Sequence, residues 1–274
     1  MDVRIRTGAK KLLATMPLLD GLFRRFIWSH RHFPEAEMAF LHSLPPHSVD
    51  VAVDVGAAMG GYAWLLDRVS NQVIAFEPGA WHFDYLSGLL FATNIKLVNA
   101  ALGAYTGEAE LYTAGEGEHA RHAATLNTSN PIAHDSEARV ETVTQTSLDG
   151  YLATSLAADS RVDIIKVDVE GYENQVILGA SKTLETHRPL VICEIEARHN
   201  PAYIYVFDTL RSLGYTCFVF RKWRYEEFSA NGIEDVQKAS DLSIRLSAEY
   251  KPGENAYINN FVFQHPSSRI KVVK

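Results

Sequence analysis

The sequence predicts an α/β fold in which helices cover both faces of a largely parallel β-sheet. Two observations lead to this prediction. Short apolar, β-branched runs alternate with helical segments between residues 49 and 264, and a glycine-rich segment follows the first of these runs. Strands that are apolar on both faces are typical of parallel sheets buried between helices. The chain has 274 residues, of which 47% are hydrophobic and 22% charged, so it is long enough to bury such a core.

The first 46 residues are expected to form a separate helical segment, broken at Pro17 and ended by Pro45 and Pro46. This segment is basic, and its cationic residues are Arg4, Arg6, Lys10, Lys11, Arg24, Arg25 and Arg31. A basic, partly apolar helix either docks on the body of the protein or lies on a membrane surface. We expect residues 47–274 to form the main domain.

Seven strands are predicted in the main domain, and most of them are separated by helices. The strands span residues 49–56, 72–78, 95–102, 162–169, 189–196, 215–220 and 257–264. The helices begin near Gly60 and span Trp81–Ala92, Tyr172–Thr186 and Tyr203–Leu213.

Two insertions interrupt this alternation, near residues 104–147 and 224–256. Within the first, residues 107–114 and 138–146 alternate apolar and polar side chains, which predicts an antiparallel β-hairpin. The polar segment 115–137 between them is interpreted either as a lid over a substrate or as a surface loop.

Composition excludes several classes of protein. The net charge of −7 argues against a partner held through nucleic-acid phosphates. Cys193 and Cys217 lie in apolar runs, so we expect buried thiols rather than a disulfide framework or a cysteine zinc site. No apolar run reaches the roughly 20 residues that cross a bilayer. We expect a cytoplasmic protein, whose basic N-terminus can bring it to the inner face of the membrane.

The segment Asp54-Val-Gly56-Ala-Ala-Met-Gly60-Gly61 follows a strand and begins a helix. Glycines there let the backbone approach a ligand, and Glu77, at the end of the second strand, is placed to accept bonds from ribose hydroxyls. The pattern fits S-adenosylmethionine or a dinucleotide. Asp54 favours the first, because a carboxylate suits a cationic ammonium group better than a pyrophosphate.

Asp168 closes the fourth strand, and Glu170 follows directly. We interpret both as side chains beside the reacting group; the alternative is that they cap the next helix.

The motifs VDVGAAMGGY, VIAFEP, LVNAALG, TSLDGYL, IIKVDVEGYE and LVICEIE resemble the FkbM family of S-adenosylmethionine-dependent methyltransferases. The resemblance runs from about Val49 to Phe263 and implies a class I methyltransferase (Rossmann-like) fold. Its seven strands have the order 3-2-1-4-5-7-6, and strand 7 is antiparallel. It also implies O-methylation of a hydroxyl on a sugar, a glycan or a polyketide-type natural product. Ala57-Ala58-Met59 departs from the family, in which Ala-Asn is more common.

The resemblance assigns a role to each matching residue. Asp54 holds the methionine ammonium, Glu77 holds the ribose, and Asp168 faces the methyl group and the acceptor. The full expected cofactor-binding set is Asp54, Gly56, Ala57, Gly60, Tyr62, Glu77, Pro78, Asn99, Ala100, Ala101 and Asp168.

A hydroxyl group needs a base or a metal to become a good nucleophile. The expected catalytic residues are Asp168, Glu170, Glu194 and His199. Binding of Mg²⁺ or Mn²⁺ by Asp168, Glu194 and His199 is a further hypothesis that no sequence spacing requires. The expected partner is a small-molecule or glycan acceptor. Two other functions stay open: an NAD(P)-dependent oxidoreductase and a non-catalytic nucleoside-binding protein.

Overall fold

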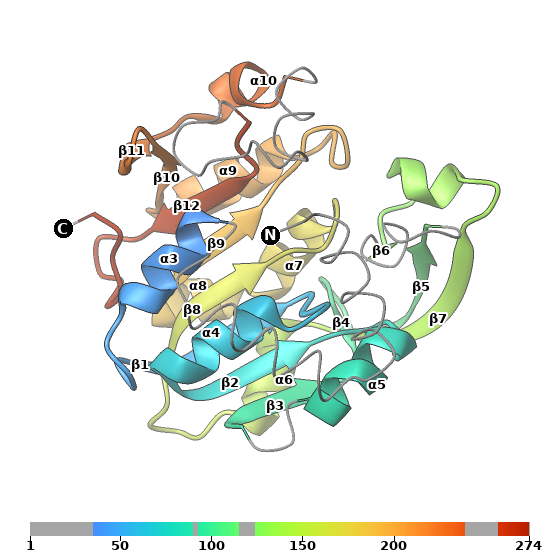
Figure 1. The fold of residues 1–274 in the computed structure, drawn as a ribbon, viewed down its shortest axis with the longest axis horizontal. Coiled ribbons are helices and arrows are strands. Elements are labelled where there is room, and N and C mark those ends of the chain that lie inside the picture. The colour runs from blue at the N-terminus through green and yellow to red at the C-terminus, as the bar shows by residue number, and fades with distance from the viewer. Residues whose placement is uncertain (1–34, 90–92, 115–123, 239–256, 274) are drawn as a thin grey trace, which may run out of the picture.

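A computed structural model describes residues 35–89, 93–114, 124–238 and 257–273. Its main sheet has eight strands in the order β11-β10-β12-β9-β8-β1-β2-β3 (Figure 1). The strand bounds are β1 Val49–Val55, β2 Ser70–Phe76, β3 Ile95–Val98, β8 Val162–Val167, β9 Leu190–Glu194, β10 Thr216–Arg221, β11 Arg224–Glu227 and β12 Asn260–Gln264.

The predicted fold and strand order are confirmed. The seven expected strands correspond to β1, β2, β3, β8, β9, β10 and β12, and their spatial order is 3-2-1-4-5-7-6. The seventh, β12, runs antiparallel to both of its neighbours. One strand of the main sheet was not predicted: β11 lies in the expected insertion 224–256 and pairs antiparallel with β10 at the sheet edge.

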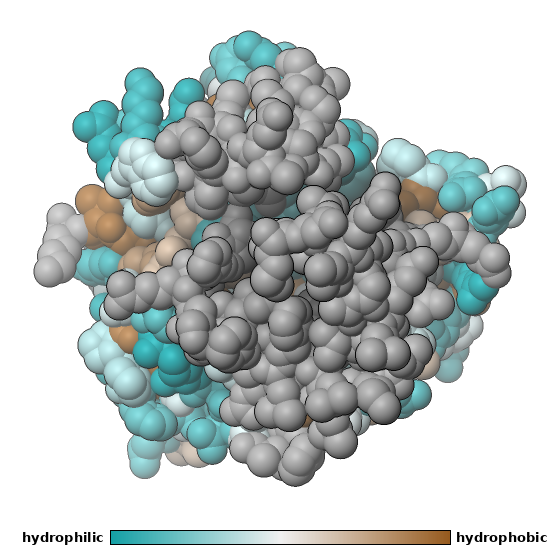
Figure 2. Space-filling model, in the orientation of Figure 1, coloured by the Kyte–Doolittle hydropathy of each residue, from teal (hydrophilic) through white to brown (hydrophobic). Residues whose placement is uncertain are grey.

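Helices cover both faces of the main sheet. Their bounds are α3 Ala36–Ser43, α4 Gly61–Val69, α5 Ala80–Leu89, α6 Leu148–Ser155, α7 Glu173–Gly179, α8 Ser181–His187, α9 Ile204–Ser212 and α10 Ile233–Val236. Alternate residues of β2 show the two layers. Val73 and Ala75 belong to clusters with α3, α4 and α5, whereas Ile74 and Phe76 pack with α6 to α9. The described residues at the rim of the face in Figure 2 are mainly hydrophilic, as expected for a sheet covered on both sides.

The predicted strand 95–102 is divided between two sheets. Its first part, β3, pairs with β2, and its second part, β4 (Ala101–Leu102), begins a four-stranded sheet of order β4-β7-β5-β6, in which β6 is Ala124–Thr125. That sheet contains the predicted hairpin, in which β5 (Gly107–Thr113) pairs antiparallel with β7 (Arg139–Thr146). The chain turns between the two sheets at Asn99, whose side-chain amide donates to the carbonyl oxygens of Glu77 and Pro78.

The helix predicted over Tyr172–Thr186 is two helices, α7 and α8, which meet at Ala180. At this join Gly179 packs so closely against the backbone of Gly103 that a Cβ on it would lie 1.9 Å from the Gly103 carbonyl oxygen. Helix α6 was not predicted; the Ser147 side chain caps it by accepting from the Gly150 amide at 3.1 Å.

Of the expected N-terminal helical segment, only α3 and its flanking residues from Glu35 onward belong to the described part of the chain. The docking or membrane role of residues 1–34 lies outside the described residues, as do residues 115–123 of the possible lid and the end of the helix predicted to Ala92. Among the helices that the described residues form, none is long and apolar enough to cross a membrane.

Candidate active site

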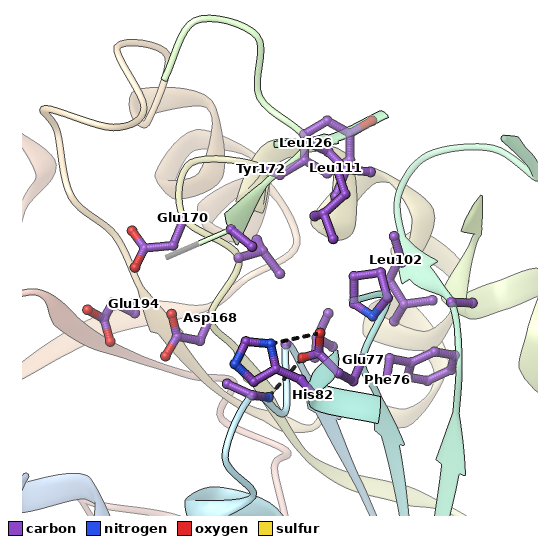
Figure 3. Close-up of a pocket in the computed structure, with 18 residues that line it drawn as sticks. Phe76, Glu77, His82, Leu102, Leu111, Leu126, Asp168, Glu170, Tyr172 and Glu194 are labelled. Atoms are coloured by element: carbon purple, nitrogen blue, oxygen red, sulfur yellow. Dashed lines mark hydrogen bonds and ion pairs between the residues drawn. The ribbon is translucent and has the colours of Figure 1, made fainter. Parts of the chain in front are cut away.

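A cavity opens at the carboxyl ends of the parallel strands β1, β2 and β8, beside the second sheet (Figure 3). Ligands of open α/β sheets bind at this edge. Three acidic side chains, Asp168, Glu170 and Glu194, lie together and form an acidic wall of the cavity. Glu77 lies across the cavity from them, next to Phe76 and Leu102. The apolar wall includes Leu102, Leu111, Leu126 and the ring of Tyr172.

The turn after β1 brings its backbone against the end of β8. Gly56 has a φ of +81°, and a Cβ on it would lie 1.9 Å from the Asp168 carbonyl oxygen. Gly60 also has a positive φ, of +78°, and caps the start of α4. Only glycine fits the space and the backbone conformation at Gly56, so the cavity floor here is bare backbone.

Glu77 is buried and fixed at the end of β2. Its two carboxylate oxygens each accept one backbone N–H, from Ala58 and from Gly79, both at 2.9 Å. Burial raises the pKa of this carboxyl group to about 7, although these two hydrogen bonds oppose the rise. Each oxygen keeps a further lone pair for a ligand.

Asp54 is buried at the end of β1, and its Oδ2 has no hydrogen-bond partner within the described part of the chain. Burial raises the pKa of this carboxyl group to about 7, while the charge of Lys166 works in the opposite direction. A buried carboxylate oxygen without a partner is costly, and a cationic ligand group would remove that cost.

A fully buried lysine, Lys166, lies next to Asp168 of the acidic wall. Its Nζ is 3.7 Å from Asp168 Oδ2, 3.4 Å from Asn260 Oδ1 and 4.7 Å from the centre of the Tyr62 ring. Burial opposes the charged form, but the charges of Asp168, Glu194 and Glu35 outweigh it and raise the pKa of Lys166. The lysine therefore stays protonated and stabilises the ionised form of Asp168.

Glu194 lies next to Asp168 at the end of β9 and accepts a hydrogen bond from Asn259. Burial, followed by the charge of Asp168, raises the pKa of Glu194 well above its usual range. Both effects favour the protonated form of Glu194.

Glu170 and His199 are in contact at the open side of the cavity. His199 Nδ1 lies 2.7 Å from Glu170 Oε2, and Glu170 itself lines the cavity. Glu170 adopts a left-handed backbone conformation, with a φ of 49°. Such a conformation is uncommon for a residue with a side chain.

The structure brings most of the predicted site residues to one cavity. The predicted residues that line it are Gly56, Glu77, Pro78, Ala100, Ala101, Asp168, Glu170 and Glu194. The others, which do not line it, are Asp54, Ala57, Gly60, Tyr62, Asn99 and His199.

Two of these non-lining residues have other contacts instead. The Asn99 amide bonds to backbone carbonyls, and the Tyr62 hydroxyl bonds to Glu35. The sequence interpretation missed His82, which packs 3.9 Å from Glu77, and Lys166. A lysine in the middle of the apolar run IIKVDV was the available signal for Lys166.

The hypothesis of a metal held by Asp168, Glu194 and His199 is not supported by the side-chain arrangement. Within the described ranges, no three His, Cys, Asp or Glu side chains are placed to hold a metal ion. His199 contacts Glu170 instead.

Comparison with known protein families matches residues 54–217 to the family described as "Methyltransferase FkbM domain". The chain belongs to the FkbM methyltransferase family. No curated protein matches this FkbM methyltransferase.

Solved structures that resemble the chain are distant from it in sequence. A methyltransferase FkbM from Methylobacillus flagellatus is 15% identical with a TM-score of 0.47, covering 94% of this chain and 58% of its own. The precorrin-6y C5,15-methyltransferase of Geobacter metallireducens is 11% identical with a TM-score of 0.40, covering 82% of this chain and 83% of its own. An rRNA methylase of Streptococcus thermophilus is 10% identical with a TM-score of 0.39, covering 83% of this chain and 92% of its own. The chain thus spans little more than half the length of the first of these structures.

Proposed function

We propose that this FkbM methyltransferase uses S-adenosylmethionine to methylate a hydroxyl group of a sugar, a glycan or a polyketide-type natural product. One observation carries the proposal: the bare turn at Gly56 and the buried carboxylate of Glu77 border the same cavity, at the ends of neighbouring strands. A turn that exposes backbone and a carboxylate that accepts from ribose hydroxyls are the two elements a nucleoside cofactor needs at this edge.

The residues present fit S-adenosylmethionine better than they fit a dinucleotide. The buried Asp54 Oδ2 lacks a hydrogen-bond partner among the residues that the structure describes, and the acidic side chains around the cavity favour a cation. The two phosphates of a dinucleotide would instead meet these carboxylates unfavourably. In this assignment Glu77 holds the ribose, Ala100 and Ala101 lie beside the base, and Asp54 stabilises the ammonium group directly or through water.

S-adenosylmethionine, when bound, supplies a methyl group already activated by its sulfonium. The protein therefore has to position the acceptor oxygen, exclude water and take up a proton. Glu170 and Asp168 face the cavity for the last task, and the apolar wall around Leu111 and Leu126 covers the less polar side of the acceptor.

The experiment that tests this function combines binding with transfer. Calorimetric titration of the full chain with S-adenosylmethionine, S-adenosylhomocysteine and NAD is expected to show binding of the first two alone. Transfer of a labelled methyl group from S-adenosylmethionine to a panel of neutral sugars and hydroxylated macrolactones then tests the acceptor class. Binding of NAD instead would favour an oxidoreductase, and binding of none of the three would favour a protein without this cofactor chemistry.

A further inference from the structure

The segment from Thr125 to Asn130 lies between the second sheet and the Glu170 turn. Two of its side chains, Thr125 and Asn130, are fully buried and polar. Both donate to the same atom, the carbonyl oxygen of Glu170, each at 2.7 Å. A third, Asn127, donates to the carbonyl oxygens of Gly171 and His199, both at 3.0 Å.

These contacts hold a turn that the chain would otherwise disfavour. Glu170 and Gly171 both have positive φ values, of 49° and 101°. A Cβ on Gly171 would lie 2.4 Å from the His199 carbonyl oxygen, so the turn and the His199 loop are packed directly together. Strained backbone persists only where the surrounding structure fixes it, and such positions are common at active sites.

The neighbouring carboxyl groups are less suited than Glu170 to take a proton. Asp168 is paired with the buried Lys166, and Glu194 lies beside Asp168 and already accepts a hydrogen bond from Asn259. Glu170, by contrast, lines the cavity, and its Oε2 lies 2.7 Å from Nδ1 of the His199 imidazole. An imidazole next to a carboxylate is a common arrangement for general base catalysis.

We propose that Thr125, Asn127 and Asn130 are positioning residues that hold the Glu170 carboxylate at the cavity edge against His199, where this pair takes the proton of the acceptor hydroxyl. In the transfer, the acceptor oxygen bonds to the methyl carbon and the methyl–sulfur bond breaks, with its electron pair left on sulfur. The hydroxyl proton goes to the Glu170–His199 pair and from there to solvent. The catalytic part of this inference rests on the proposed function; the holding of the turn does not.

Variants of similar shape separate the role of these hydrogen bonds from that of general packing. Thr125→Val removes the hydroxyl at constant shape, and Thr125→Ser restores it. Asn130→Asp keeps the oxygen that accepts from the Ile132 amide but loses the N–H donor to Glu170. Gln264→Leu is the matched control, because Gln264 also holds backbone through its amide, on β12, away from the cavity.

Amide hydrogen exchange of the full chain, read in peptides covering residues 168–173, tests the holding role without any acceptor. Exchange at least tenfold faster is expected in Thr125→Val and Asn130→Asp, and wild-type exchange in Thr125→Ser and Gln264→Leu. Exchange in Thr125→Val equal to that of wild type would overturn the proposal.

Methyl transfer to the best sugar of the panel tests the catalytic role. Glu170→Gln is expected to lower kcat about 100-fold or more, and Thr125→Val at least tenfold, with S-adenosylhomocysteine affinity within twofold of wild type. Thr125→Val added to Glu170→Gln is expected to cause no further loss. Additive losses, or an equal loss in Gln264→Leu, would refute the catalytic role. Faster exchange in Thr125→Val, together with no methyl transfer to any panel member by wild type, would support the holding role and reject the proposed acceptor class.

Discussion

Replacing Glu77 with glutamine perturbs the cofactor site with little change of shape. Glu77 accepts one backbone N–H on each oxygen, from Ala58 and Gly79. Glutamine keeps one acceptor oxygen, so one of these N–H groups and one ribose hydroxyl lose their partner. Glu77→Gln is therefore expected to weaken the binding of S-adenosylhomocysteine more than it destabilises the fold.

The magnitude follows from the hydrogen bonds that are lost. A hydrogen bond to a charged group contributes about 1.5–3 kcal/mol. Losing the hydrogen bond to one ribose hydroxyl and weakening the bond to the other costs about 3 kcal/mol of binding free energy. This corresponds to a dissociation constant about 100-fold larger. The pH adds a second test, because burial raises the pKa of Glu77 to about 7. At pH 6 only about a tenth of such groups are ionised, so wild-type binding is expected to be about tenfold weaker than at pH 8.

Calorimetric titration with S-adenosylhomocysteine at pH 6 and pH 8 measures both effects. Because Asp54, whose pKa burial also raises to about 7, titrates in the same range, the difference between wild type and Glu77→Gln is the informative quantity. Glu185→Gln, an exposed position on α8, is the control and is expected to bind as wild type. Affinity of Glu77→Gln within twofold of wild type at both pH values would refute this role for the Glu77 carboxylate.

Three further substitutions test the packing and charge of the site by urea denaturation. Gly56→Ala places a Cβ 1.9 Å from the Asp168 carbonyl oxygen and is expected to lower the free energy of unfolding by about 3 kcal/mol or more. Gly88→Ala is the control, because a Cβ there meets no described residue within 4 Å, and an equal loss in both variants would contradict the crowding at Gly56. Glu173, the first residue of α7, accepts a hydrogen bond from the Gly171 amide beside Glu170. Burial raises its pKa from 4.5 to about 7, so its ionisation costs the folded state about 3 kcal/mol as pH rises through this range. Glu173→Gln should remove that loss, and identical slopes between pH 5 and pH 8 would speak against it. Lys166→Met leaves the Asp168 carboxylate without its cation and should lower the free energy of unfolding by about 3 kcal/mol at pH 8. The loss should be smaller at pH 5, where Asp168 can take up a proton, and a loss independent of pH would contradict this pairing.

Most of the main sheet could be predicted from the sequence because its strands are short apolar runs bounded by glycine and proline. The run at 49–55, closed by Gly56, and the run at 72–76, closed by Pro78, are examples. Strand β11 and the division of residues 95–102 could not be predicted in the same way. The division of residues 95–102 depends on which distant strands its two parts pair with, β2 and β7, and local pattern does not contain that information. Strand β11 pairs with the adjacent β10 across a turn at Lys222 and Trp223, which lacks the glycine or asparagine that usually marks such a turn.

The candidate site was predictable where it lies directly at strand ends, as for Glu77 and Asp168. Lys166 was missed because the pattern of a buried strand does not show that a lysine side chain will pair with the carboxylate of Asp168, two residues along the chain. The contact of Thr125 with Glu170 joins residues 45 positions apart, and no local motif marks it. The segment interpreted as a lid or a loop thus contains, in its described part, residues that contact the acidic wall.

A crystal structure of the chain with S-adenosylhomocysteine tests the central claim most directly. The expected result is a nucleoside whose ribose hydroxyls lie within hydrogen-bond distance of Glu77, with its sulfur near the Gly56 turn and Asp168. A nucleoside bound elsewhere, or a ribose turned away from Glu77, would contradict the proposed function.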